Sequence, residues 1–256
     1  MTQNVYPFTN ENLSSYQHIY DFDNSKVLTV LGSGDQYFSS LLYGAKTIEV
    51  YDCNFLSWDF FVLKFYGILI LNYEEFYDFF VLKRLDDMKT LKRLLPYLPK
   101  DTVNRLERIQ KQYKKLSRIL YLDIIDDKYQ NGRVIPYFDR EKYYQLQSIL
   151  IKQKLPIFYL SQIQYLPLII EHQTYDVIMT SNIFDWLYPD LEEGNIKEYR
   201  ELLKQFNCKE IQALYSWDLS ETIKYEFEKH GFEIQFVPSV KTLSLSKDYV
   251  ISLRNN

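Results

Sequence analysis

One short apolar run limits the fold of this chain more than any other feature of its sequence. Residues 26–31 read Lys-Val-Leu-Thr-Val-Leu, and the run ends at Gly32-Ser33-Gly34, before a helical pattern over residues 36–43. A buried strand that turns at glycines into a helix is the usual start of a β-α-β unit. The pattern therefore predicts a parallel sheet whose first turn lets the backbone approach a ligand closely.

Similar apolar runs recur and mostly alternate with longer helical patterns. We expect further strands at residues 47–51, 155–160, 175–180, 210–215, 232–237 and 248–253. Alternation of this kind favours a parallel sheet with helices on both faces. The last two runs have no helix between them, so we expect them to pair antiparallel. Seven strands with this ending predict an α/β fold, the Rossmann-like and mostly parallel sheet of class I methyltransferases.

The strand pattern stops over residues 73–150, where helical periodicity dominates and prolines break it. We interpret this stretch as a helical insertion between the second and third strands. The rest of the chain then forms one Rossmann-like domain in two parts, residues 1–72 and 151–256.

Positive charge is concentrated inside this insertion. Residues 83–118 contain 12 Lys and Arg but only four Asp and Glu, although the net charge of the whole chain is −4. The simplest interpretation is a solvated helical face. An excess of eight positive charges also suits an anionic partner, such as a lipid surface, a nucleic acid or a phosphorylated metabolite. We expect these helices to cover the ligand pocket and to offer that surface to an acceptor.

Asp52 ends the second predicted strand, 20 residues after Gly32. A carboxylate there has two acceptor oxygens and suits the vicinal hydroxyls of a ribose. The alternative is that Asp52 caps the helix that begins near Phe55. A nicotinamide dinucleotide is disfavoured, because Tyr37 replaces the third glycine of its motif. The cofactor that we expect is S-adenosylmethionine, which has no pyrophosphate to accommodate.

Several motifs together resemble a known family. They are Glu11-Asn-Leu, the strand and turn of residues 27–36, Tyr-Asp52-Cys-Asn54, Tyr73-Glu-Glu-Phe76 and residues 175–186. This set resembles the betaine-lipid-synthase-like family, whose members are similar to S-adenosylmethionine:diacylglycerol 3-amino-3-carboxypropyltransferases. The resemblance implies S-adenosylmethionine as cofactor and transfer of its aminocarboxypropyl arm. The chain is shorter than expected of a lipid-modifying member, which leaves the lipid acceptor open.

One position departs from the usual methyltransferase pattern. Class I enzymes commonly carry an acidic residue two positions before the first glycine, where it holds the cofactor's amino group, and here that residue is Val30. Asp35 either takes over this contact or only complements the dipole of the helix that it begins.

The remaining site residues follow from the topology, since parallel sheets bind ligands beyond the carboxyl ends of their strands. Gln162 follows the third strand and either bonds the adenine edge or lies in a surface loop. Ser181 and Asn182 follow the fourth strand and should face the sulfonium. Asp185 and Trp186 are candidates for contact with the acceptor, with a packed core aromatic as the alternative for Trp186. The expected cofactor site thus comprises Gly32, Ser33, Gly34, Asp35, Asp52, Gln162, Ser181 and Asn182.

Other site classes are disfavoured by the residues present. Cys53 and Cys208 have no further Cys or His at metal-ligand spacing, so we expect no metal site and two reduced thiols, as in a cytoplasmic protein. The longest apolar stretch, residues 55–71, contains Asp59 and Lys64 and does not suit a membrane span.

No nucleophile–base–acid set stands out, and the catalytic residues stay unassigned. Attack on a sulfonium carbon depends on alignment more than on a general base. We therefore expect an enzyme, an S-adenosylmethionine-dependent transferase that moves a methyl or a 3-amino-3-carboxypropyl group to an unidentified acceptor. The alternative is a non-catalytic S-adenosylmethionine- or nucleotide-binding protein, which Val30 at the usual acidic position favours.

Overall fold

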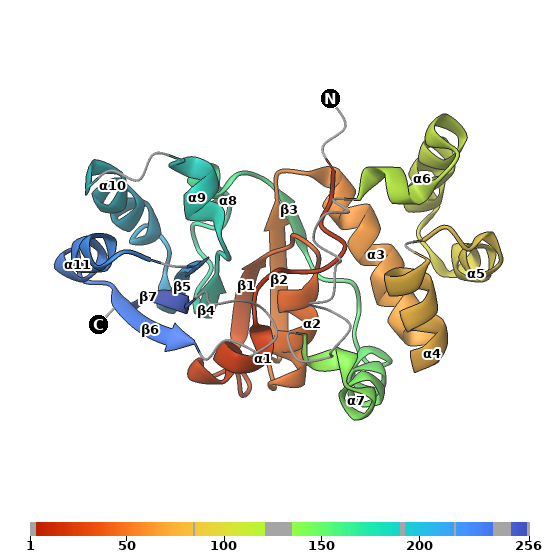
Figure 1. Cartoon of the computed structure of the whole chain (residues 1–256), viewed down its shortest axis with the longest axis horizontal. Helices are drawn as coiled ribbons and strands as arrows, with labels where there is room; N and C mark the ends of the chain where they lie inside the picture. Colours follow the sequence, from red (N-terminus) through yellow and green to blue (C-terminus); the bar gives the residue numbers. More distant parts are fainter. Residues whose placement is uncertain are drawn as a thin grey trace.

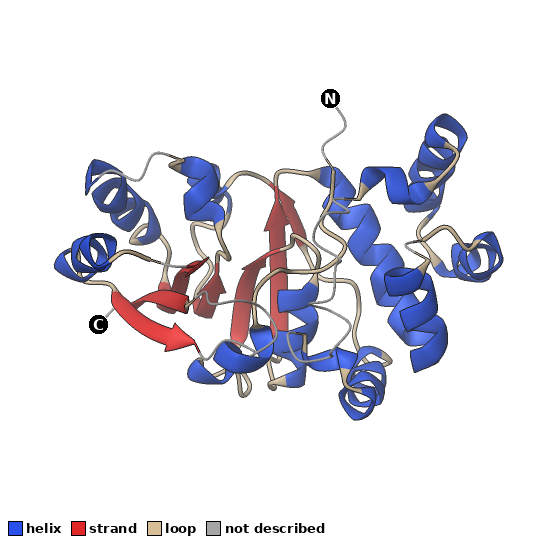
Figure 2. Cartoon of the chain, viewed as in Figure 1, coloured by secondary structure: helices blue, strands red, loops and turns tan. Residues whose placement is uncertain are grey.

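The described strands form one mixed sheet. The computed structural model describes residues 4–83, 85–120, 135–189, 193–217, 219–237 and 247–254. The strand order is β3-β2-β1-β4-β5-β7-β6 (Figures 1 and 2). The strands are β1 (Lys26–Val30), β2 (Thr47–Asp52), β3 (Phe158–Leu160), β4 (Tyr175–Met179), β5 (Cys208–Trp217), β6 (Glu233–Val237) and β7 (Asp248–Arg254).

The pairing directions identify the fold. Strands β1 to β5 pair parallel, whereas β7 lies antiparallel between β5 and β6. This is the order of the Rossmann-like methyltransferase sheet, so the predicted fold class is confirmed. The antiparallel strand sits next to the edge because β6 and β7 follow each other without a helix that could cross the sheet.

Side chains of each central strand alternate between two cores. In β1, Val27 belongs to the core beneath α2, α3 and α7, and its neighbour Leu28 to the core beneath α8, α10 and α11. Successive strand residues point to opposite faces, which places one apolar cluster on each side of the sheet. Figure 1 shows α3 to α7 on one side and α10 and α11 on the other.

The α-helices are α1 (Leu13–Tyr16), α2 (Asp35–Leu42), α3 (Phe55–Ile70), α4 (Tyr73–Phe76), α5 (Met88–Leu94), α6 (Lys100–Tyr113), α7 (Arg140–Leu150), α8 (Leu166–Ile169), α9 (Ile183–Leu187), α10 (Glu193–Leu203) and α11 (Glu221–Lys229). Gly44 follows α2 with φ +101°, the left-handed conformation expected of a helix C-terminus. The short helices α1, α8 and α9 were not predicted, because a single turn shows no periodicity. None of the described helices has the length and apolar character needed to cross a membrane.

Helices occupy the described part of the chain between β2 and β3. Residues 73–95, where helical periodicity begins, form α4, a π-helical segment (Tyr77–Leu82) and α5 rather than one continuous helix. The break occurs where Asp87 begins a new helix, its side chain accepting from the Lys89 backbone N–H at 3.0 Å. Residues 121–134 of the proposed insertion lie outside the described residues, and the division of the chain into an insertion and a two-part domain remains a prediction.

Candidate cofactor-binding site

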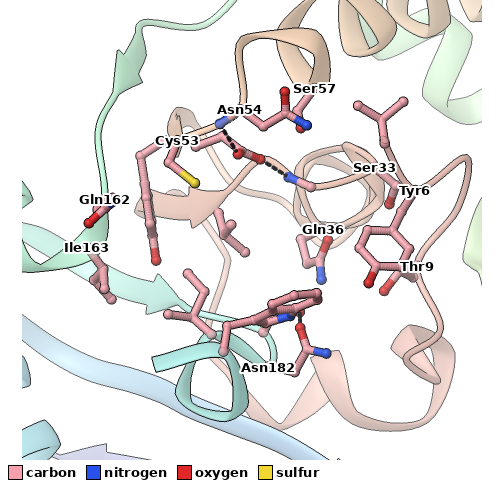
Figure 3. Close-up of a pocket in the computed structure, with 18 of the residues that line it drawn as sticks. Tyr6, Thr9, Ser33, Gln36, Cys53, Asn54, Ser57, Gln162, Ile163 and Asn182 are labelled. Carbon is pink, nitrogen blue, oxygen red and sulfur yellow. Dashed lines mark hydrogen bonds between the residues drawn. The ribbon is translucent and has the colours of Figure 1, made fainter. Parts of the chain in front are cut away.

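A cavity of about 510 Å³ lies at the carboxyl ends of β1, β2, β3 and β4. Figure 3 shows Gln162 and Ile163 on one side of it and Tyr6 and Thr9 on the opposite side. The lining residues are Asn4, Val5, Tyr6, Thr9, Asn10, Val30, Gly32, Ser33, Gln36, Tyr51, Asp52, Cys53, Asn54, Ser57, Ser161, Gln162, Ile163, Gln164, Ser181, Asn182, Ile183, Trp186 and Leu187. Six of the eight residues expected at the site are among them, so the strand ends do gather these side chains.

The glycine turn uses its two glycines differently. Gly32 lines the cavity with φ +48°, and a Cβ added there would meet no atom within 4 Å. Gly34 has φ +83° and does not line the cavity; a Cβ there would lie 2.7 Å from the Phe61 ring. Gly32 therefore brings the backbone to the cavity, while Gly34 is required by packing against α3. The expectation that Gly34 itself meets the ligand is not supported by this geometry.

The Asp52 side chain, at the end of β2, is hydrogen-bonded to the turn that follows β1. Its carboxylate accepts from the backbone N–H of Gly32 at 3.0 Å and from that of Asn54 at 2.7 Å, as Figure 3 shows. The helix cap of α3 is Asn54, whose side chain accepts from Leu56 N at 3.1 Å. Burial raises the pKa of the Asp52 carboxyl, and hydrogen bonds from the Asn54, Gly32 and Cys53 backbone and the Ser57 side chain oppose that rise. Asp52 also lines the cavity beside this turn.

Asp35 begins α2, where its charge complements the helix dipole, and it does not reach the cavity. The side chain is fully buried and absent from the cavity lining. Its carboxylate accepts from Lys64 Nζ at 2.9 Å, from Thr9 N at 2.5 Å, from Ser33 Oγ at 2.7 Å and from the Tyr137 hydroxyl. These donors use the acceptor positions that a cofactor amino group would need. Ser33 itself lines the cavity, while its hydroxyl points to this buried network.

The loop after β4 is held in an uncommon backbone conformation. Ser181 has φ +58°, in the left-handed region that side chains other than glycine seldom adopt. The buried Gln212 side chain on β5 accepts from Ser181 N at 2.8 Å and from Thr180 N at 3.0 Å. Outliers of this kind persist only where the surroundings fix them and are common at functional sites. Asn182 lies next to Ser181 in the same wall of the cavity.

The other predicted residues differ in position. Gln162 is exposed and lines the cavity after β3. Trp186 also lines it and is 63% exposed, so it is not a packed core aromatic. Asp185 is outside the lining, and burial raises its pKa to about 6.

Sequence analysis missed the wall formed by the N-terminal segment. Asn4, Val5, Tyr6, Thr9 and Asn10 line the cavity although they precede the first strand by many residues. This segment is held by two buried side chains. Asp35 on α2 accepts from Thr9 N, and Lys64 on α3 donates to Pro7 O. Its only signal is a run of Thr, Asn and Glu side chains without periodicity, which alone does not separate a binding wall from an exposed tail.

The expectation that the helices of residues 73–150 cover the cavity is wrong for the described residues. No residue between Ser57 and Ser161 lines it. Part of the basic excess is also neutralised, since Arg105 pairs with Asp59 at 2.7 Å and Arg93 with Glu75 at 2.6 Å. These acidic partners lie outside residues 83–118, where the sequence count could not reveal them.

The described residues contain no candidate metal site. Within the described ranges, no group of three or more His, Cys, Asp and Glu side chains could hold a metal ion. Cys53 is an exposed thiol at the cavity, Cys208 is a buried thiol, and the two do not form a disulfide.

The comparisons with known proteins bear on the fold of this chain and not on its activity. A scan against protein-family models gives no match, and a search of curated proteins gives none, so the resemblance to the betaine-lipid-synthase-like family finds no support. Similar solved structures include ribosomal protein L11 methylase from Lactobacillus delbrueckii subsp. bulgaricus, with 10% identity, TM-score 0.36 and 91% of this chain matched to 70% of that one.

Two others are an rRNA methylase from Escherichia coli and the rRNA methyltransferase AviRa from Streptomyces viridochromogenes. Both are 12% identical, with TM-scores of 0.38 and 0.37. They match 94% and 91% of this chain, which spans 62% and 77% of theirs. The likeness is loose, and the fold assignment rests on the strand order.

Proposed function

We propose that this chain binds S-adenosylmethionine in the cavity at the strand ends and transfers its methyl group to an acceptor. The observation that carries the proposal is the placement of Asp52. Its carboxylate stands at the cavity beside the Gly32 turn, within a sheet of methyltransferase order. Ligands of such sheets bind at this edge, where a carboxylate after the second strand accepts from ribose hydroxyls.

The residues present fit the parts of this cofactor. Asp52 would accept from the two ribose hydroxyls, and Gln162 with Ile163 after β3 would lie along the adenine. Gly32 would let the backbone approach, while Ser181 and Asn182 would face the sulfur. A largely preformed cavity with a few converging polar groups is typical of a small-molecule site.

When bound, S-adenosylmethionine supplies an electrophilic carbon on a cationic sulfur. The task of the chain is to align an acceptor atom with that carbon and to exclude water from it. A bond forms from the acceptor atom to carbon, the carbon–sulfur bond breaks, its electron pair leaves sulfur neutral, and the acceptor's proton passes to solvent. When both reactants are held in line, their translational and rotational entropy is already lost on binding, which lowers the barrier of the reaction step without a dedicated base. The Ser181 loop, which the Gln212 side chain holds in a fixed conformation, suits this positioning task.

Calorimetry followed by product analysis tests the proposal. The protein is titrated with S-adenosylmethionine and then incubated with the cofactor plus total RNA or a phospholipid extract. S-adenosylhomocysteine as product supports methyl transfer, whereas methylthioadenosine would indicate transfer of the aminocarboxypropyl arm. Bound cofactor without either product would favour the non-catalytic alternative that Val30 suggests, and absence of binding would contradict the proposal.

Asp52→Asn should weaken S-adenosylmethionine binding by about 1–3 kcal/mol, because one oxygen acceptor becomes an N–H₂ donor facing hydroxyl groups. Calorimetry on the variant and on wild type measures the difference. Asp176→Asn is a matched control, since that carboxylate lies at the opposite end of the sheet and accepts from Lys26 N. Unchanged affinity in a folded Asp52→Asn protein would remove Asp52 from the site.

We also propose that the acceptor is anionic and enters past the loop that follows α6. Val5 in the cavity wall donates its N–H to Ile119 O at 2.8 Å, which places the exposed Arg118 beside that wall. Lys111 and Lys114 are also exposed, and none of the three makes an ion pair among the described residues. Positive charge beside a cavity raises the local concentration of an anionic partner.

Charge reversal of Lys111, Lys114 and Arg118 should therefore weaken binding of an anionic polymer and flatten its salt dependence. The measurement is fluorescence anisotropy with a labelled single-stranded RNA at several salt concentrations. Affinity for S-adenosylmethionine should not change, because these side chains do not line the cavity. Equal salt slopes for variant and wild type would leave a solvated face as the explanation.

A further inference from the structure

Glu11 is a buried carboxylate that no Lys or Arg in the described part of the chain neutralises. Its side chain is fully buried, and no described Lys or Arg forms an ion pair with it. It is held only by neutral donors: the Tyr16 hydroxyl, the Ser181 hydroxyl, and Gln36 Nε2 at 3.2 Å. Removing a carboxylate from water without a counter-charge is costly, so such groups are rare unless they serve a function.

The position of this carboxylate is directly behind the cavity. Two of its three donors, Ser181 and Gln36, are cavity-lining residues. Figure 3 shows Gln36 between Ser33 and the loop of Asn182, and Gln36 and Ser181 both donate to Glu11. The carboxylate is thus linked to the cavity wall through hydrogen bonds from these two polar side chains.

The buried charges around this wall do not balance. Lys64 is the buried ammonium there, and it already donates to Asp35 at 2.9 Å, to Pro7 O at 2.8 Å and to Ser33 O at 2.7 Å. Its three donor positions are therefore used. Glu11 and Asp52 remain without a cation among the described residues. Asp52 on the lining and Glu11 behind it thus give this wall an acidic character that suits a cationic ligand.

A second unsatisfied polar group belongs to a residue of the same wall. Tyr51 lines the same cavity and is 1% exposed, yet within the described structure its hydroxyl has no hydrogen-bond partner. Buried polar atoms are nearly always bonded, so the wall carries an unsatisfied hydroxyl as well as an unpaired carboxylate.

We propose that Glu11 provides the negative charge that holds the cationic methionine end of the ligand, in place of the acidic residue that Val30 does not supply. The inference rests on the proposed function. Glu11 acts through Ser181 and Gln36 and is thus a positioning residue. Burial raises the pKa of its carboxyl, and the neighbouring carboxylate of Asp35 acts in the same direction. A cation in the cavity would favour the ionised form.

The test compares three ligands on wild type and Glu11→Gln, a variant of nearly equal shape without the charge. S-adenosylmethionine carries a sulfonium and an ammonium, S-adenosylhomocysteine only the ammonium, and methylthioadenosine neither. Glu11→Gln should weaken S-adenosylmethionine by roughly 10- to 100-fold and change methylthioadenosine less than about twofold. Loss of S-adenosylhomocysteine affinity to the same extent would identify the ammonium as the group held, and its retention the sulfonium.

Tyr16→Phe is the matched control, because it removes one donor to Glu11 but keeps the charge, and it should cause no selective loss. Equal losses for all three ligands in Glu11→Gln, or none, would overturn the role of Glu11 while leaving the proposed function intact. Wild type that binds none of the three would overturn the proposed function and the inference with it.

Wild-type protein gives a second measurement should Glu11→Gln fail to fold. The ratio of S-adenosylmethionine to methylthioadenosine affinity should fall as the pH is lowered, since protonation removes the charge of Glu11. The titratable groups facing it are Tyr16, Tyr20, Tyr215 and Asp35. Burial raises the pKa of each tyrosine, so they stay neutral, and Asp35 is paired with Lys64. A ratio that stays constant down to the pH at which the fold is lost would overturn the inference.

Discussion

Replacing Lys64 with methionine is expected to lower the free energy of unfolding by about 3–5 kcal/mol. The Lys64–Asp35 pair is fully buried, with 2.9 Å between Nζ and Oδ1. Methionine keeps the length of the side chain but leaves Asp35 as an unpaired buried charge. It also removes the donors to Pro7 and Ser33, which join the N-terminal wall to the glycine turn. Cofactor affinity should fall together with stability.

Equilibrium denaturation in urea measures this loss. Arg93→Met is the control, because Arg93 also pairs with a carboxylate, that of Glu75, but on the surface. Exposed pairs contribute little, so this variant should unfold like wild type. Similar stabilities for the Lys64 and Arg93 variants would show that the buried pair does not support the fold.

Gly34→Ala is expected to destabilise the fold by about 2–5 kcal/mol, combining strain at positive φ with overpacking. The backbone has φ +83° there, and the new methyl group would lie 2.7 Å from the Phe61 ring, which packs among other aromatic rings of the core. The aromatic neighbours leave Phe61 little room to move. Thermal unfolding and denaturant titration measure the effect.

Gly32→Ala separates packing from binding. At this position, with φ +48°, an added Cβ meets no atom within 4 Å and projects at the cavity, so only the strain of about 1–2 kcal/mol applies. This variant should lose more cofactor affinity than stability, and Gly34→Ala the reverse. The opposite order would contradict the different roles assigned to the two glycines.

Local patterns predicted the sheet well because its strands are short apolar runs with clear ends. The same rule placed Asp52, Gln162, Ser181 and Asn182 at one edge, since parallel strands bring their carboxyl ends together. Contacts between residues that are far apart in the sequence could not be predicted from these local patterns. Asp35 stands directly after the glycine turn, yet Lys64, 29 residues away, draws it into the core.

Long-range contacts also explain the missed N-terminal wall. Its placement depends on single bonds such as Thr9 N to Asp35 and Val5 N to Ile119 O, which leave no periodic trace in the sequence. The helices after β2 were expected to cover the cavity and do not line it. Their positive charge was visible in the count, but their packing against the outer side of α3, through Arg105 and Asp59, was not.

The most direct test of the central claim is protection of Cys53 from alkylation. Cys53 is an exposed thiol at the cavity beside Asp52, whereas Cys208 is buried and serves as an internal control. Burial raises the pKa of both thiols, that of Cys208 to about 12, so the reaction is run near pH ~9, where Cys53 yields more thiolate. Peptide mass spectrometry follows the modification of each cysteine at increasing concentrations of S-adenosylmethionine.

If the cofactor occupies this cavity, the alkylation rate of Cys53 should fall by about tenfold or more at saturation, with a midpoint equal to the calorimetric Kd. Cys208 should remain unmodified throughout. A protein that binds S-adenosylmethionine by calorimetry while Cys53 reacts at an unchanged rate would contradict the account, because the ligand would then lie elsewhere.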